Sequence, residues 1–324
     1  MPRAIGLLSG GLDSILAVRL LLEQHIEILA VSFVTPFFTS RKGERAALSL
    51  GVPFRSVDIT DEHLEMMRHP KHGFGRNMNP CVDCHALMLR IAGGIMEREG
   101  YDFLFTGEVL GERPKSQNRQ ALGIVAKECG YPDLVLRPLS AKHLDPTRPE
   151  REGLVDRERL LDLEGRSRKP QMTLAEQWGI TDYPTPAGGC LLTEPAYAKK
   201  LRELWDHTPD ASADDVRLLA VGRHLRLTPE TKLVVGRKEA ENDRLETLVR
   251  PGDVKLFVFG IPGPVAILRG PADAASRRLA AEITARYSDA SPDAPVAVVL
   301  STDGVETTLT VTPAEPENCT ALLV

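Results

Sequence analysis

The sequence predicts an α/β fold with a parallel sheet, followed by a small α+β domain. In the first half, short apolar runs alternate with segments of helix length, which is typical of a parallel sheet covered by helices on both faces. In the second half, short strands are separated by turn residues. With 324 residues, the chain is long enough for a core in each of two domains.

The elements expected in the first half follow one another at regular intervals. Arg3–Leu8 is an apolar run that ends in Ser-Gly-Gly, which indicates a buried strand. The further strands are expected at 26–34, 54–59 and 101–106, and the helices at 13–22, 41–50 and 85–99. Ligands bind beyond the carboxyl ends of the strands in such sheets, so the informative positions follow Leu8, Val34 and Phe105.

The second half has a different character after an irregular, charged stretch from about 138 to 170 and a short helix at 171–178. Pro184, Pro186, Gly188 and Gly189 break regular structure just before Cys190. Strands are expected at 216–221, 232–235, 254–258 and 265–268, a helix at 274–287, and a hairpin of 296–300 with 306–311 across Asp303-Gly304. The predicted organisation is a first domain over 1–185, a linker over 186–212 that carries Cys190, and a second domain over 213–314.

The composition is that of an ordinary globular protein, with 42% hydrophobic and 26% charged residues. It excludes disordered, collagen-like and disulfide-dense classes. No apolar stretch reaches about 18 residues, so no membrane span is expected. The N-terminus indicates a strand and not a signal peptide, which predicts a cytoplasmic protein. A net charge of −5 and a pI of about 6.0 give no support to an indiscriminate nucleic-acid binder.

A glycine-rich loop follows the first strand. In Ser9-Gly10-Gly11-Leu12-Asp13-Ser14, the glycines let backbone N–H groups approach a phosphate, and the start of the next helix favours the same negative charge. Ser9 and Ser14 add hydroxyl donors, and Asp13 is a candidate for holding Mg²⁺. The alternative is a plain strand–turn–helix corner with Ser9 as a helix cap. The string lacks the Lys-Ser/Thr ending of a Walker loop, which argues against kinases and GTPases.

The string SGGLDS resembles the loop of the PP-loop ATPases. This resemblance implies that ATP is cleaved between its α and β phosphates and that a substrate oxygen is activated as an adenylate. It also implies phosphate contacts at Ser9, Gly10, Gly11, Asp13 and Ser14, and adenine contacts at Ser32 and Phe33. Thr106-Gly107-Glu108 resembles the later strand-end motif of the same fold, which makes Gly107 a further nucleotide-binding candidate.

The chain has five cysteines, and an odd number in a reducing compartment argues for metal binding or catalysis and not for a disulfide framework. Cys81 and Cys84 form a CxxC after Asn79-Pro80, a spacing that suits either one metal or a redox pair. Two glycines precede Cys190 and leave its sulfur unhindered. Cys129 and Cys319 are expected to be structural.

Two of these cysteines resemble those of the bacterial tRNA 2-thiouridylases, which implies that Cys190 carries a persulfide and that Cys84 releases the sulfur by forming a disulfide. The additional Cys81 instead resembles the iron–sulfur-dependent tRNA thiolases. That resemblance implies a [4Fe–4S] cluster held by Cys81, Cys84 and Cys190, and it is the favoured reading. A zinc site is a third alternative, for which His85 is a candidate fourth ligand.

Two polar strings are candidates for substrate contact. One lies in 107–117, beyond the strand that ends near Phe105, and the other is the basic turn 165–171. The alternative for both is a solvated surface loop. The candidate residues are Arg113, Lys115, Ser116, Gln117, Arg166, Arg168 and Lys169.

Two Gly-Arg pairs, Gly222-Arg223 and Gly236-Arg237, lie on neighbouring predicted strands of the second domain. This stretch resembles the small RNA-binding domain of NFACT type.

The combined hypothesis is an enzyme that thiolates tRNA, with ATP, Mg²⁺ and a cluster as cofactors and a sulfide or persulfide carrier as sulfur donor. The alternatives are a PP-loop ligase or sulfurtransferase acting on a small molecule, and a non-catalytic iron–sulfur or RNA-binding module.

Overall fold

The computed structural model describes residues 1–184 and 189–324, which form two compact units, Met1–Thr193 and Glu194–Val324. The predicted segment 186–212 spans the division between them, and its positions 186–188, with Thr185, lie outside the described residues. No helix in the described part of the chain is both long and apolar enough to cross a membrane.

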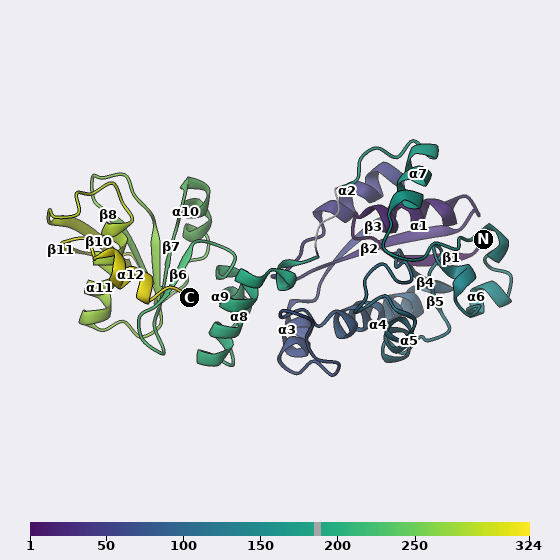
Figure 1. Cartoon of the computed structure of the whole chain (residues 1–324), viewed down its shortest axis with the longest axis horizontal. Helices are drawn as coiled ribbons and strands as arrows, with labels where there is room; N and C mark the ends of the chain where they lie inside the picture. Colours follow the sequence, from purple (N-terminus) through teal and green to yellow (C-terminus); the bar gives the residue numbers. More distant parts are fainter. Residues whose placement is uncertain (185–188) are drawn as a thin grey trace. The chain divides into compact units, whose positions relative to one another are not determined.

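The first unit is built on a parallel sheet of five strands in the order β3-β2-β1-β4-β5 (Figure 1). Its strands are β1 (Arg3–Leu7), β2 (Glu27–Val34), β3 (Phe54–Asp58), β4 (Phe103–Thr106) and β5 (Val135–Leu136). Its α-helices are α1 (Leu12–Leu22), α2 (Arg41–Leu50), α3 (Thr60–Arg68), α4 (Cys81–Glu99), α5 (Arg119–Glu128), α6 (Arg148–Arg151) and α7 (Lys169–Gln177). Three short 3₁₀ turns complete it: η1 (Ala141–His143), η2 (Arg157–Arg159) and η3 (Leu191–Thr193).

Both faces of this sheet are buried, because successive strand residues enter different cores. In β4, Phe103 and Phe105 pack with α1, α2 and α7, whereas Leu104 packs with α4 and α5. Figure 1 shows these two groups of helices on opposite sides of the sheet. The predicted parallel α/β fold is confirmed, and β5 is a strand that the sequence patterns did not predict.

The second unit is a six-stranded antiparallel sheet in the order β11-β10-β8-β9-β7-β6. Its strands are β6 (Arg223–Arg226), β7 (Lys232–Val235), β8 (Val254–Val258), β9 (Ala266–Arg269), β10 (Val296–Thr302) and β11 (Val305–Val311). Its helices are α8 (Pro195–His207), α9 (Ala213–Leu218), α10 (Glu239–Glu246), α11 (Ala274–Arg286) and α12 (Pro316–Ala321). The expected hairpin is confirmed: Asp303 and Gly304, with φ of 50° and 84°, supply the left-handed backbone of a tight turn.

One predicted strand is wrong. Residues 216–221 were expected to be extended, but α9 runs through them to Leu218 and a turn follows. Ser212 and Asp215 form a capping box in which each side chain bonds the other's backbone N–H. This cap starts a helix where the apolar content of 216–221 alone suits either structure.

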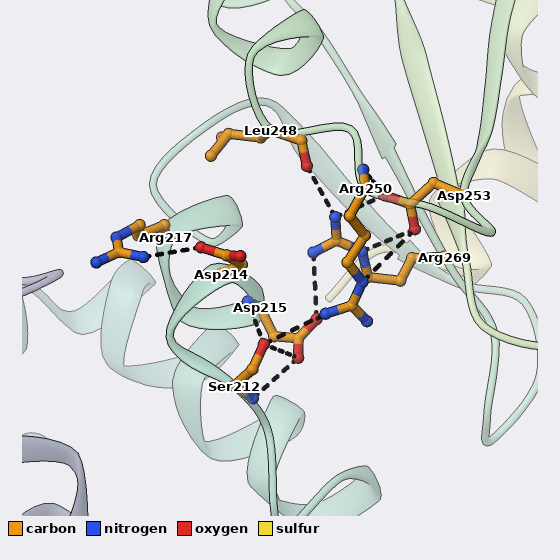
Figure 2. Close-up of polar contacts among 8 residues, drawn as sticks. All are labelled: Ser212, Asp214, Asp215, Arg217, Leu248, Arg250, Asp253 and Arg269. Carbon is orange, nitrogen blue, oxygen red and sulfur yellow. Dashed lines mark hydrogen bonds and ion pairs between the residues drawn. The ribbon is translucent and has the colours of Figure 1, made fainter. Parts of the chain in front are cut away.

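A charged network fastens α9 to the sheet of the second unit (Figure 2). Arg269 on β9 is buried and donates to Asp253 at 2.6 Å and to Asp215 at 3.1 Å. Arg250 also contacts Asp215, at 3.0 Å. The network therefore joins three parts of the second unit: α9, β9 and the loop that precedes β8. Its arginine and aspartate charges neutralise one another.

Removing one member of this network is expected to be costly. Arg269→Ala leaves the buried carboxylate of Asp253 and the half-buried one of Asp215 short of a partner and should lower the free energy of unfolding by about 3–5 kcal/mol. The matched control is Arg217→Ala, because Arg217 pairs with Asp214 on the exposed side of α9, where a pair contributes about 1 kcal/mol or less. Urea denaturation followed by circular dichroism measures both, and equal losses would contradict the structural role of Arg269.

Candidate nucleotide and sulfur site

The strand order of the first unit defines a switch point between β1 and β4. The chain continues from β1 to β2 on one side and returns to β4 on the other, and ligands bind at the carboxyl ends of such a pair. The loop Ser9–Ser14 follows β1, and Gly107 follows β4. The two predicted nucleotide-binding motifs therefore meet at this point of the sheet.

The conformation of the loop requires glycine. Gly10 has a φ of 77°, and a Cβ atom there would lie 2.4 Å from the carbonyl carbon of Lys42. The Ser14 hydroxyl donates to the Gly11 carbonyl at 2.8 Å, and the Gly11 N–H lies 3.3 Å from the Ser9 hydroxyl oxygen. These contacts hold the loop against the start of α1, where backbone N–H groups are available to a phosphate.

Gly107 lies against the same loop. A Cβ atom at this position would be 2.5 Å from both the carbonyl carbon of Asp13 and the backbone nitrogen of Ser14. Since both of those atoms belong to backbone, only a shift of α1 away from β4 would relieve the contact. Gly107 thus sets how closely the loop approaches the end of β4.

Gly107→Ala is therefore expected to destabilise the protein by about 1–3 kcal/mol, the usual cost of overpacking a rigid contact. The matched control is Gly123→Ala on α5, where a Cβ atom meets no other atom within 4 Å. This second change should be stabilising, because alanine favours helix over glycine. Denaturant titration gives both values, and a Gly107→Ala protein as stable as the wild type would contradict the close approach.

Asp13 is a half-buried carboxylate with cations nearby. Burial raises its pKa, while Arg168, a hydrogen bond with Gln171 and Arg113 act in the opposite direction. Asp13 Oδ1, Arg168 Nε and Gln171 Oε1 are buried without a hydrogen-bond partner within the described residues. Buried polar atoms are rarely left so, which favours a ligand or cation at this place.

Two loops bring these cations together. Leu110 forms a bridge with Glu164, and the Gly165 N–H donates to the Leu110 carbonyl at 2.7 Å. This pairing places the predicted loops 107–117 and 165–171 side by side. It explains how Arg113 and Arg168, far apart in sequence, both act on Asp13.

The other predicted contact residues differ in their surroundings. The Ser32 hydroxyl donates to the Leu8 carbonyl, and Phe33 is buried in the core with α4. Gln117 closes its own loop, since its side-chain oxygen accepts from the Arg113 N–H at 3.1 Å, and Ser116 is buried beside it. Lys115, Arg166 and Lys169 are exposed.

The CxxC lies in the first turn of α4. The helix was expected to start at His85, but it begins at Cys81, directly after Pro80. The Asn79 amide donates to the Cys81 sulfur at 3.2 Å, and the Asn77 amide donates to the Thr193 carbonyl at 2.6 Å. The second contact ties the turn that follows Cys190 to the segment that precedes the CxxC.

The three thiols share one environment. Burial raises the pKa of Cys84 well above its usual value, and Cys190 and Cys81 add to the effect. Burial also raises the pKa of Cys190, which Cys81 raises further and Arg113 lowers. Cys84 and Cys190 are therefore thiols and not thiolates at neutral pH in this arrangement.

The thiols as they lie do not fit a bound cluster. In residues 1–184 and 189–324, no group of three or more Cys, His, Asp or Glu side chains is placed so that it could hold a metal ion. His85, the candidate fourth zinc ligand, directs Nδ1 to Glu108 at 2.8 Å. Cys129 and Cys319 are buried in the two cores, as structural cysteines are.

The sequence patterns did not predict one residue that contacts the CxxC. His63 on α3 is fully buried in contact with the rings of Phe37 and Phe38, and its Nε2 lies 3.3 Å from the Cys84 sulfur. Burial lowers the pKa of His63 to about 4, so the ring is neutral. No local motif marks His63, because only the packing of α3 on α4 brings it to Cys84.

A second polar group connects the CxxC helix to the strand ends. Glu108 accepts from Arg137 at 3.0 Å, from Thr106 at 3.0 Å and meets His85 on α4. Burial alone would raise the pKa of Glu108, but Arg137 and His85 outweigh it and hold the value at about 2. The carboxylate therefore stays ionised and fixes α4 relative to β4 and β5.

A parallel sheet with a glycine-rich loop at its switch point is typical of nucleotide-binding domains. Residues 2–144 match the model of the family described as thiamine biosynthesis protein (ThiI). Residues 222–322 match the model described as NFACT protein RNA binding domain. These matches confirm the two resemblances on which the sequence prediction depends.

The curated relatives act on tRNA according to their names. The probable tRNA sulfurtransferase of Oceanobacillus iheyensis is 28% identical over 146 residues, which are 42% of this chain and 34% of that protein. The tRNA-specific 2-thiouridylase MnmA of Syntrophotalea carbinolica is 32% identical over 118 residues, 31% of this chain and 32% of that protein. The chain thus spans about a third of the length of the relatives that it matches.

Among solved structures, a predicted subunit of tRNA methyltransferase from Methanocaldococcus jannaschii is similar at 15% identity. The match covers 55% of this chain and 76% of that chain, with a TM-score of 0.35. At this score the similarity carries no structural argument.

Proposed function

We propose that the protein thiolates tRNA at the expense of ATP. The observation that carries the proposal is the glycine-rich loop Ser9–Ser14 at the switch point of the sheet, where Gly107 lies against Asp13 and Ser14. Arg113 lowers the pKa of both Asp13 and Cys190, as a cation near both groups would. The groups that would activate a base and those that would deliver sulfur thus face one region. The family matches and the names of the relatives support the same activity.

The first step would be adenylation of a uridine carbonyl oxygen. The backbone of Gly10 and Gly11 and the hydroxyls of Ser9 and Ser14 would bind the phosphates of ATP. The unpartnered Oδ1 of Asp13 suits a Mg²⁺ ion, which commonly takes one or two carboxylates together with substrate phosphates. The carbonyl oxygen would attack the α-phosphorus, and pyrophosphate would leave. Since AMP is a better leaving group than oxide, the carbon becomes open to sulfur.

The second step would be sulfur transfer through the thiols. A donor of persulfide type would transfer its outer sulfur to the Cys190 thiol and leave as a thiol, so that Cys190 carries a persulfide. The terminal sulfur of this persulfide would attack the activated carbon and displace AMP. Cys84 would then attack the Cys190 sulfur, which breaks the sulfur–sulfur bond, releases the thiolated base and forms a Cys84–Cys190 disulfide. A thiol reductant would restore both cysteines for the next turnover.

The iron–sulfur cluster predicted from the CxxC stays a prediction, and no step above depends on it. Anaerobically purified protein that carries a cluster should contain iron and acid-labile sulfide and show a broad visible absorbance. Colourless, iron-free protein that still thiolates tRNA would contradict the cluster. Cys319→Ser serves as the matched control, since it should not alter the iron content.

The second unit would bind the tRNA, and the exposed Arg166, Lys169 and Lys115 of the first unit would contact its backbone. We place this activity in the cytoplasm.

Mass spectrometry of tRNA nucleosides from a deletion strain tests the proposal, with a plasmid-borne wild-type gene as the control. A thionucleoside should disappear and return with the gene. An unchanged set of nucleosides would instead favour a small-molecule substrate.

A further inference from the structure

A small cavity in the second unit lies outside every motif considered above. It has a volume of about 310 Å³ and is lined by one acidic, one basic and otherwise apolar residues. The lining residues are Glu246, Lys255, Phe257, Val258, Ile261, Gly263, Pro264 and Val265. All of them lie within the segment that matches the RNA-binding family.

The position of the cavity follows from the alternation of β8. Val254, Leu256 and Val258 belong to the core beneath α11, so Lys255 and Phe257 point to the opposite face of the sheet. Phe257 is half-buried and pairs across the strands with Val299 of β10. Just beyond the strand, Phe259 is 69% exposed. Phe259 thus adds an exposed aromatic ring directly after Val258, which lines the cavity.

The chemistry of the lining favours a flat, uncharged ring. Lys255 Nζ lies 5.7 Å from the centre of the Phe257 ring and 3.4 Å from the Glu246 carboxylate. The carboxylate would repel a phosphate group, but it can accept a hydrogen bond from the amino group of a nucleobase. Phe257 provides a stacking face, and Ile261 and Pro264 add apolar walls.

We propose that this cavity binds one unpaired nucleobase of the tRNA, stacked on Phe257. The inference rests on the proposed function, because it takes tRNA as the ligand. Unpaired bases are the parts of RNA that proteins read by stacking and edge contacts, since paired bases are closed within the helix. The site would therefore let the second unit prefer single-stranded RNA over duplex, independently of its surface charge.

The test measures RNA binding by the full chain, with a labelled single-stranded RNA oligonucleotide, a duplex of the same sequence and a tRNA transcript. Phe257→Leu keeps the apolar contact but removes the stacking face. It should weaken binding of the single strand by roughly 5- to 150-fold and leave duplex binding unchanged. Phe257→Tyr keeps the ring and should bind as the wild type does. Val305→Ala, at an exposed apolar position on β11, is the matched control and should have no effect.

A direct readout guards against loss of folding in the leucine variant. In Phe257→Trp, the added indole emission should be quenched by the single strand and not by the duplex. Equal binding by the wild type and a folded Phe257→Leu protein, or an unquenched indole, would overturn the inference. Wild-type protein that binds none of the RNAs would overturn it as well. The nucleoside assay is separate: unchanged binding with intact thiolation contradicts only the cavity, whereas stacking without thiolation contradicts only the proposed reaction.

Discussion

Cys190→Ser is expected to abolish formation of the thionucleoside while adenylation continues. A serine oxygen cannot carry the transferable sulfur, so the loss should be at least about a thousandfold, as for removal of other covalent nucleophiles. Pyrophosphate release reports the first step and mass spectrometry of the nucleosides reports the second. Cys319→Ser, at a buried cysteine in the core of the second unit, is the matched control and should leave both unchanged.

Cys84→Ser adds a sharper result to the same assay. Without the Cys84 thiol, nothing would break the sulfur–sulfur bond after transfer, so tRNA should remain attached to Cys190 through a disulfide. The adduct would appear as a shifted band on a denaturing gel and would disappear with a reductant.

If the Cys190→Ser protein continues to form thionucleoside, sulfur does not pass through that residue.

Asp13→Asn is the second change with a large expected effect. It removes the only charge on the phosphate loop itself and with it the carboxylate available to Mg²⁺. Adenylation, followed by pyrophosphate release, should fall by about a hundredfold or more. Asp61→Asn, which removes the same charge at an exposed position on α3, is the matched control and should retain activity.

The stability of the Asp13→Asn protein separates loss of function from loss of fold. The pKa of Asp13 is raised by burial, so the folded state disfavours the ionised form that exists at neutral pH. A neutral asparagine should therefore leave the free energy of unfolding equal to or above that of the wild type. An inactive protein that is also strongly destabilised would contradict this interpretation of Asp13.

Loops and turns could be predicted from the sequence where the residues that determine their conformation lie close together in the chain. The loop 9–14 was predictable because its glycines, its position after a buried strand and the start of α1 all lie within a few residues. The same holds for the hairpin at Asp303-Gly304. The strand expected at 216–221 was wrong because the spacing of its apolar residues suits a helix as well as a strand. The capping box at Ser212 favours the helix.

Contacts between segments far apart in the chain could not be predicted from the sequence patterns. His63 meets Cys84 only through the packing of α3 on α4. Arg113 and Arg168 act together on Asp13 because Leu110 and Glu164 pair, a contact between residues more than fifty positions apart. The sequence pattern identified both arginines as candidate contact residues. It did not predict that both of them act on Asp13.

The separation into two units has a consequence for how stability must be measured. Among the described residues, the two cores on either face of the parallel sheet belong to the first unit, and the core beneath α11 belongs to the second. Two such bodies can melt independently, and a calorimetric scan of the whole chain should then show two transitions instead of one. A single melting temperature would average them, so the effects of Gly107→Ala and Arg269→Ala belong to different transitions of the same scan.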